Sequence, residues 1–284
     1  MYCGEWCSEK NQLTLRNTNQ RASQLAVSPD GSIVWRLNQG RLLVLMKADQ
    51  KSDNWQEIQS GVKKLALNET TGFILTLDGH LMAQVKLSAA NPFRDDKQEH
   101  IQCPEQLKHI TCTSELLLCI TVDGKILGRT GMCSGTPLGN SWSHVPSLNK
   151  WAITDLTLQE HISCGGGPPS YTVFVTNDKG QLFYTQADRD SLLLEEMLLW
   201  YQVRVPGTNL NLEGNRSSST LWAINAQKDS CLMLNTKSVQ GSVWKTLDFA
   251  ETKNQLQRVK KINANALYGN EGTYFYLPDF ESTR

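Results

Sequence analysis

The 284-residue sequence predicts an all-β fold built from repeated units of about 45 residues, and three observations support this prediction. A tryptophan followed three residues later by an aliphatic residue recurs along the chain. An apolar stretch, a turn and a second apolar stretch follow in a constant phase. Hydrophobic residues make up 39% of the chain and form short runs along its whole length, as in a protein of many short strands.

The tryptophan marker, Trp-x-x-Ile/Val/Leu, opens four segments. They begin at Trp55, Trp142, Trp200 and Trp244. The gaps of 87, 58 and 44 residues include one double gap, so a further unit is predicted near residue 101, where Ile101 replaces the tryptophan. Counting back from Trp55 places a first unit at Trp6.

The turn marker is a glycine between two apolar strands. It occurs at Gly40, Gly79, Gly124 and Gly180. Glycine accepts the positive φ that tight hairpin turns require, so each of these residues is predicted to turn a β-hairpin. A fifth hairpin, at residues 221–233, lacks the glycine.

Units of this length with several strands are typical of β-propeller blades, which stack around an axis because one blade cannot bury both of its faces. We predict one domain, residues 1–284, that forms a six-bladed β-propeller of four-stranded antiparallel blades. The blades are predicted at about residues 6–54, 55–100, 101–141, 142–199, 200–243 and 244–284. N-terminal residues 2–6 or 13–16 are expected to close the ring by pairing near residues 273–277.

Two insertions interrupt the repeat. Residues 187–197 predict a short helix capped by Asp190 or Ser191. Residues 87–99 are polar and predict an exposed loop.

Charge and composition exclude several classes of function. The 28 Lys and Arg balance the 28 Asp and Glu, so no basic footprint for nucleic acid is expected. Two small basic clusters, Lys63–Lys64 and 258–261, are interpreted as solvated strand ends. No apolar run reaches the length of a membrane span, and residues 1–10 do not resemble a leader peptide. We therefore expect a cytoplasmic protein whose eight cysteines are reduced.

A search for reactive groups identifies one candidate metal cluster, Cys103, His109, Cys112 and Cys119. Only His109 and Cys112 have the close spacing that structural zinc sites use, so two buried thiols and a surface histidine are the preferred interpretation. We find no nucleophile motif and no phosphate-binding loop. The sequence predicts no catalytic residue, no metal and no cofactor, and it assigns no binding residues.

Residues 33–38 and 221–225 resemble the tectonin β-propeller repeat. The closest stretch contains Arg129-Thr-Gly131, Pro137-x-Gly139 and Trp142-x-x-Val145, and it is similar to the intracellular tectonin β-propeller repeat-containing proteins. This resemblance implies a non-enzymatic scaffold or adaptor in autophagy or membrane trafficking. It implies protein partners from those processes, and a peripheral place on autophagosomal or endoplasmic reticulum membranes through such partners, without direct insertion.

Other functions remain open at this stage. Secreted tectonins bind glycans, so a carbohydrate-binding lectin module is the main alternative. A second alternative is a nucleotide-exchange factor of the chromosome-condensation-regulator type. The repeats of such proteins contain several glycines each, whereas this whole chain has only 20 glycines, which disfavours this function. Trp55–Ile58 and Tyr274–Leu277 also match a peptide that ubiquitin-like autophagosome proteins recognise by strand addition, although packing between blades explains both segments more simply.

Overall fold

The computed structural model describes most of the chain. The described residues are 2–7, 12–17, 23–29, 32–46, 55–94, 98–146, 152–161, 167–194, 198–205, 210–214, 220–225, 230–235, 244–246, 259–263, 266–269 and 274–276. Before residue 23 and after residue 205 only the backbone of these segments is described, apart from Leu221 and Trp244.

Strands account for nearly all of the described secondary structure, and all the sheets are antiparallel. Five sheets have four strands each: β3 (Gln24–Val27), β4 (Val34–Asn38), β5 (Arg41–Leu45), β6 (Trp55–Gln59); β7 (Val62–Leu67), β8 (Gly72–Thr76), β9 (Leu81–Gln84), β10 (Gln98–Ile101); β11 (Leu107–Cys112), β12 (Leu117–Thr121), β13 (Ile126–Thr130), β14 (Ser141–Val145); β15 (Ile153–His161), β16 (Ser170–Asn177), β17 (Leu182–Asp188), β18 (Tyr201–Val203); β19 (Leu210–Gly214), β20 (Thr220–Asn225), β21 (Ser230–Asn235), β22 (Trp244–Thr246). A three-stranded sheet contains β23 (Val259–Asn263), β24 (Ala266–Gly269) and β25 (Tyr274–Tyr276), and a two-stranded sheet contains β1 (Tyr2–Cys7) and β2 (Gln12–Asn17).

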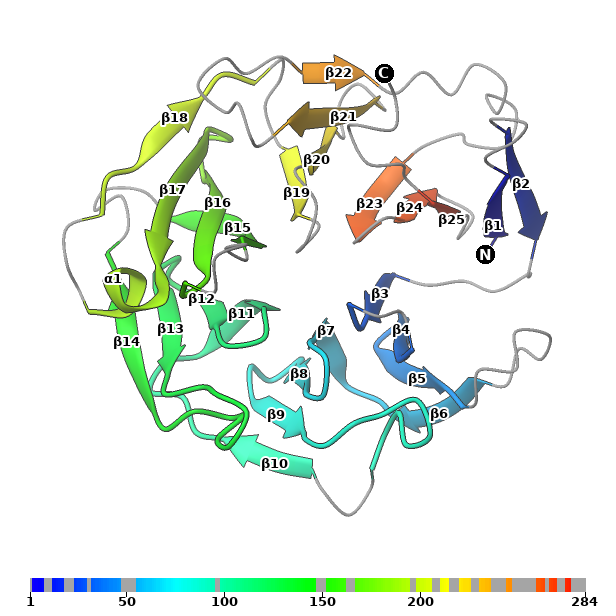
Figure 1. The fold of residues 1–284 in the computed structure, drawn as a ribbon, viewed down its shortest axis with the longest axis horizontal. Helices are drawn as coiled ribbons and strands as arrows, with labels where there is room; N and C mark the ends of the chain where they lie inside the picture. Colours follow the sequence, from blue (N-terminus) through cyan, green and yellow to red (C-terminus); the bar gives the residue numbers. More distant parts are fainter. Residues whose placement is uncertain are drawn as a thin grey trace.

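The sheets are arranged in a ring, and in each of them the strands follow one another in chain order from the centre outward (Figure 1). The innermost strands are neighbours in a cycle that runs through β3, β7, β11, β15, β19 and β23 and returns to β3. Strand β1 lies beside β25, so the N-terminal strand adjoins the last described strand. Residues 2–7 therefore lie beside residues 274–276, in the region where the sequence predicts that the ring closes.

The sheets and the sequence units are out of phase by one strand. The predicted boundaries at residues 55, 142, 200 and 244 fall at the outermost strand of a sheet, because β6, β14, β18 and β22 each pair with the hairpin before them. A repeat recurs at the same point of every sheet, so its period predicts the number of residues per sheet but not which strand comes first.

The core lies between neighbouring sheets. Strand β12 shows how one strand serves two neighbours: Leu117 and Cys119 join the cluster shared with β7–β10, whereas Leu118 and Ile120 join the cluster shared with β15–β18. Side chains alternate between the two faces of a strand, and here both faces are buried. This explains why the apolar runs are continuous rather than alternating.

The predicted helix is shorter than expected, and a different residue caps it. Helix α1 spans Arg189–Leu193, because β17 continues as far as Asp188. The N-cap is Asp188, whose carboxylate accepts a hydrogen bond of 2.7 Å from the backbone N–H of Ser191. Within the described residues, no helix is long and apolar enough to cross a membrane.

The prediction of an exposed loop at residues 87–99 is only partly correct. Residues 88–91 are exposed, but Leu87 is buried and the ring of Phe93 lies 5.9 Å from that of Trp35. Strand β10 also begins within the segment, at Gln98. The apolar residues at the two ends of the loop are drawn into the core between the first two sheets.

Candidate interaction surfaces

The four marker tryptophans lie on or next to the outermost strands, spread around the ring. Three of them donate a hydrogen bond to the sheet before their own. The indole Nε1 of Trp142 donates to the carbonyl oxygen of Gln102 (2.7 Å), that of Trp200 to Pro146 (2.8 Å), and that of Trp244 to Arg204 (2.7 Å). Each acceptor immediately follows the outermost strand of the preceding sheet. The repeated tryptophan is therefore a link between successive sheets.

Trp55 differs from the other three. Its Nε1 is buried, and in the described part of the chain it has no hydrogen-bond partner. The guanidinium of Arg36 lies 4.3 Å from the centre of its ring. Ile58 packs against the core, so the Trp55–Ile58 segment directs both of its motif side chains into the protein although β6 is an outermost strand. The side chains of Tyr274–Leu277 lie outside the described residues.

Trp35 has a structural role that the marker did not predict. Its side chain is completely buried, and its Nε1 donates a 2.8 Å hydrogen bond to the carbonyl oxygen of Pro92, in the loop between β9 and β10 of the next sheet. Gly72 lies directly against the ring, because a Cβ at this position would overlap it. The only feature of the sequence that could have indicated this role is that Trp35 lies within an apolar strand.

The tectonin-like motif forms one compact local structure. The Arg129 guanidinium donates from Nε to the carbonyl oxygen of Leu138 (2.9 Å) and from a terminal nitrogen to that of Gly139 (3.4 Å). It also lies 5.0 Å from the centre of the Trp142 ring. The arginine thus holds the loop before β14 and stacks on the tryptophan that follows the loop.

The four marker glycines occupy the turns between the second and third strands of four sheets. Their φ values are +77° at Gly40, +83° at Gly79, +82° at Gly124 and +72° at Gly180. Two of these turns also bind the next sheet: the carbonyl oxygen of Gly40 accepts from Val62 N, and that of Gly124 accepts from Ile153 N, both at 2.9 Å. These turns and the first residues of the innermost strands lie at one end of the ring, which we call the turn face.

Polar side chains connect three innermost strands at the turn face. Strands β7, β11 and β15 each have a one-residue irregularity in their pairing immediately before Lys64, His109 and Asp155. Lys64 Nζ lies 2.7 Å from His109 Nε2, which lies 3.0 Å from Asp155 Oδ1. His109 is therefore a bridge between strands rather than the surface histidine that the sequence suggested.

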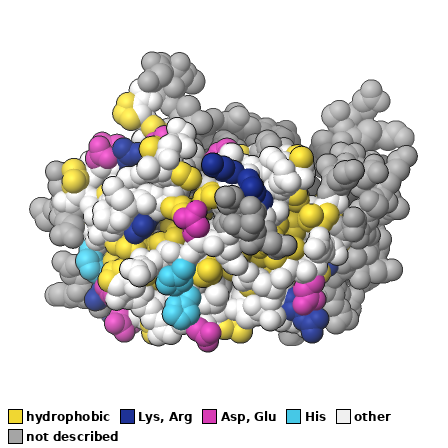
Figure 2. All heavy atoms as spheres, turned by 90° about the horizontal axis from the view of Figure 1, so that it is seen from below, with side chains coloured by type: hydrophobic (Ala, Val, Ile, Leu, Met, Phe, Trp, Pro, Cys, Tyr) yellow, Lys and Arg dark blue, Asp and Glu magenta, His cyan; other side chains and the backbone are white. Residues whose placement is uncertain are grey.

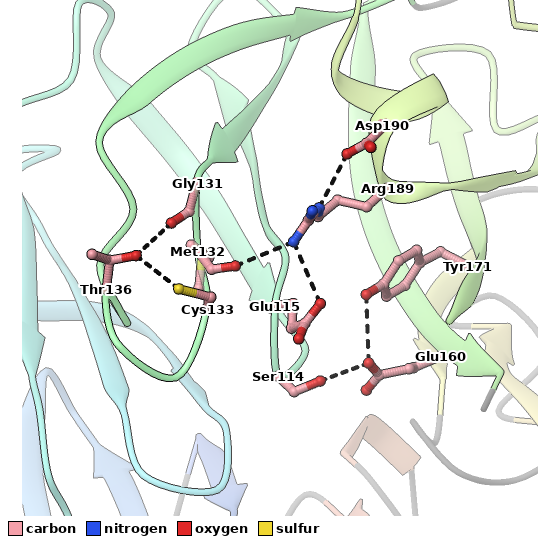
Figure 3. Close-up of polar contacts among 10 residues, drawn as sticks. All are labelled: Ser114, Glu115, Gly131, Met132, Cys133, Thr136, Glu160, Tyr171, Arg189 and Asp190. Carbon is pink, nitrogen blue, oxygen red and sulfur yellow. Dashed lines mark hydrogen bonds and ion pairs between the residues drawn. The ribbon is translucent and has the colours of Figure 1, made fainter. Parts of the chain in front are cut away.

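The opposite end of the ring, the long-loop face, carries a polar network between the third and fourth sheets (Figure 3). Arg189 of α1 forms ion pairs with Glu115 (3.4 Å) and Asp190 (3.3 Å), and it donates to the carbonyl oxygen of Met132 (3.3 Å). The arginine thereby fastens α1 to the neighbouring sheet.

A second part of this network surrounds Glu160, whose Oε1 accepts hydrogen bonds from Ser114 Oγ (2.6 Å) and Tyr171 OH (3.5 Å). Burial, and then the charge of Glu160, raise the pKa of Tyr171, so its phenol stays protonated. Both parts of the network join one sheet to the next, which identifies them as structural contacts.

The candidate cysteine–histidine group is not assembled as a metal site in the described residues, where no three His, Cys, Asp or Glu side chains are placed to share an ion. Cys103, Cys112, Cys119 and Cys133 are free thiols. Burial raises the pKa of Cys119 and, to a smaller extent, that of Cys103. The other four cysteines lie outside the described side chains.

Comparison with known proteins places these features in context. No family model matches the chain. A stretch of 122 residues is 30% identical to tectonin beta-propeller repeat-containing protein 2 from Homo sapiens. That match covers 42% of this chain and 8% of the human protein, so the chain spans a small part of the length of this relative.

Several solved structures have a similar fold. The β-propeller domain of Cps50 (Swd1) from Myceliophteria thermophila has a TM-score of 0.57 at 12% identity, over 95% of this chain and 86% of that one. Hsv2 from Kluyveromyces lactis has a TM-score of 0.52 at 12% identity, over 91% and 75%. Prp20p from Saccharomyces cerevisiae, which binds Gsp1p and histones, has a TM-score of 0.50 at 11% identity, over 86% and 69%. The chain therefore has a β-propeller fold.

Proposed function

We propose that this chain is a non-enzymatic protein-interaction scaffold or adaptor, a tectonin-type propeller of six blades that acts in autophagy or membrane trafficking. The observation that carries the proposal is the 30% identity to a human tectonin repeat-containing protein. The compact Arg129–Trp142 structure supports it, because the tectonin-like residues act together there. The cycle of six innermost strands supports the blade count.

The proposed binding mode is docking of protein partners on the loops and turns. Prp20p, which has a similar fold, binds Gsp1p and histones. The proposed location is the cytoplasm, with attachment to autophagosomal or endoplasmic reticulum membranes through partners. Figure 2, which looks at one side of the ring, shows basic, acidic and apolar side chains interspersed among the described residues. Such a mixed surface suits the polar, partly apolar contacts of non-obligate interfaces.

Exposed apolar side chains give the partner two alternative docking positions. On the turn face, Leu77 is 62% exposed and Val122 is 52% exposed. After α1, which joins the long-loop face, Leu194 and Leu199 are 64% and 65% exposed. Large exposed aliphatic side chains contribute most to an interface when a partner desolvates them.

The test is affinity purification of the tagged chain from cells, followed by mass spectrometry, with two matched variants. Leu77→Ser with Val122→Ser alters the turn face, and Leu194→Ser with Leu199→Ser alters the long-loop side. We expect autophagy, coat or tethering components in the wild-type eluate, and their loss from one variant but not the other. A glycan array run in parallel addresses the lectin alternative: specific glycan binding without a protein partner would contradict the scaffold proposal.

A further inference from the structure

We infer that the start of the innermost strands on the turn face is a binding site for a compact oxyanion of the phosphate type. The site is formed by Lys63, Lys64 and Lys108, which we call the inner lysine cluster. This inference is independent of the proposed role in trafficking, because it concerns a small charged group rather than the identity of a protein partner.

Two neighbouring strands supply the cluster. Lys63 and Lys64 lie at the irregularity of β7, and Lys108 lies at the corresponding irregularity of β11. Lys63 is exposed, whereas Lys64 and Lys108 are half-buried. A pairing irregularity places an extra residue at one point of a strand, and such points often redirect side chains. Two adjacent strands therefore carry three lysines at the same level of the ring.

The positive charges of the cluster are only partly compensated. Burial lowers the pKa of Lys108, and the charge of Lys63 lowers it further, although Asp123 partly opposes this effect. Lys63 and Lys108 form no ion pair within the described residues. The ammonium of Lys64 is 2.7 Å from the Nε2 of His109, a neutral acceptor when unprotonated. Neighbouring cations that form no ion pair favour an anion that would lie between them.

His109 strengthens this preference because its Nε2 serves two neighbours. That nitrogen accepts from Lys64 when it carries no hydrogen, or donates to Asp155 at 3.0 Å when it carries one. One atom cannot do both at the same time. When the hydrogen is on Nε2, Asp155 is engaged with the imidazole, and Nε2 is then no acceptor for the Lys64 ammonium.

The surroundings favour a compact anion over an extended acidic chain. The turns next to the cluster expose carboxylates at Asp78, Asp123 and Asp178. The first of these turns adjoins the strand that carries Lys108, because the Gln106 side chain donates to the carbonyl oxygen of Asp78 at 3.1 Å. A long acidic peptide would meet these carboxylates, whereas a single phosphate group contacts only the lysines. Lysine is a common point-charge partner of phosphate.

The backbone repeats this arrangement once more. Strand β23 carries Val259-Lys260-Lys261 with the same pairing irregularity as Val62-Lys63-Lys64 of β7. Strand β3 is the neighbour of both β23 and β7. The sequence pattern therefore places a second pair of lysines at the equivalent register position, two strands away.

The test is calorimetric titration of the full chain with inorganic pyrophosphate at low ionic strength. The Lys63→Gln, Lys108→Gln double variant is expected to bind at least roughly tenfold more weakly than the wild type, because two charge-assisted contacts are lost. The matched control, Lys125→Gln with Lys179→Gln, removes the same charge from the same face and is expected to bind like the wild type. Lys125 pairs with Glu105 at 3.2 Å, outside the cluster.

Two further measurements complete the test. Circular dichroism confirms that each variant is folded, and the single Lys63→Gln variant, at an exposed position, replaces the double variant if that one unfolds. A phosphoserine peptide titrated in a second arm identifies the source of the anion: binding there points to a phosphorylated partner, and binding of pyrophosphate alone points to a small molecule. Absence of binding in both arms, or an equal loss in the control variant, would overturn the inference.

Discussion

The indole nitrogen of Trp142 donates a 2.7 Å hydrogen bond to the carbonyl oxygen of Gln102, which lies on the preceding sheet. Trp200 and Trp244 repeat this contact one and two sheets further along. A residue first noticed as a sequence marker is thus the donor that joins each of these sheets to the one before it.

Replacing Trp142 by phenylalanine keeps an aromatic ring but removes the donor. We expect the free energy of unfolding to fall by about 1–2 kcal/mol, from the lost hydrogen bond and the weaker stacking with Arg129. Urea denaturation of the purified chain measures the change. Tyr201→Phe, at an exposed aromatic of β18, is the control and should leave the midpoint unchanged. An unaltered midpoint for Trp142→Phe would show that the link adds nothing to stability.

Gly72 and Trp35 should behave as a coupled pair. An alanine at position 72 would overlap the far ring of Trp35, so Gly72→Ala is expected to destabilise the fold by about 1–3 kcal/mol. Trp35→Phe removes that part of the ring, and the double variant should therefore lose less than the sum of the two single changes. The control is Gly135→Ala, where a Cβ meets no atom within 4 Å. Strict additivity in a double-mutant cycle would refute the coupling.

Stability should fall in mild acid through His161. Burial lowers its pKa below the ordinary value of 6.5, and its Nε2 lies 2.8 Å from the Thr172 hydroxyl. The unfolded chain binds a proton more readily than the folded chain, so this contribution is fully present above pH 6.5 and is lost as the pH falls through the folded-state pKa. Urea midpoints measured at about pH 7 and pH 5 should differ less for His161→Gln than for the wild type. The pKa of Asp188 is also lowered, but from an ordinary value of 3.8, so Asp188 affects stability only in stronger acid than the pH range of this measurement.

Cys133 should be the most reactive of the four described thiols. It is exposed, and the Thr136 hydroxyl, followed by nearby backbone N–H groups, lowers its pKa. Burial raises the pKa values of Cys103 and Cys119, and Cys112 is buried. Because the thiolate is the nucleophile, brief treatment with iodoacetamide should label Cys133 before the other three. Peptide mass spectrometry measures the order, with Cys133→Ser as the control, and earlier labelling of Cys103 would contradict this expectation.

The contact between β1 and β25 predicts that the ring depends on its last strand. Removing residues 272–284 deletes β25 and leaves β1 without this neighbour, so we expect a lower and less cooperative thermal transition. Removing residues 278–284 alone spares β25 and serves as the matched control. A transition within about a degree or two of the intact chain would refute this closure, since a change of 1 kcal/mol already shifts the melting temperature by several degrees.

Periodicity accounts for what could be predicted from the sequence. The marker tryptophans and the turn glycines each recur in four of the five four-stranded sheets, because most sheets make the same contact with their neighbour and the same tight turn. The all-β class and the propeller fold could therefore be predicted from these two markers. The strand that begins each sheet could not be predicted, because the spacing of a repeat does not show where in the repeat a sheet starts. The cap of α1 was also missed, since it depended on how far β17 extended before Asp188.

The candidate site shows the limit of this reasoning more clearly. From the sequence, Lys63 and Lys64 are interpreted as a solvated strand end, and His109 is interpreted as a surface residue near two buried cysteines. Lys64, His109 and Asp155 are about one sheet apart in sequence, and no local pattern brings them together. By itself the sequence determined the repeated strands, the turns and the apolar faces, because these depend on neighbours close along the chain. Only the ring decided which lysines, histidines and carboxylates meet, because stacking sheets around one axis places their inner strands side by side.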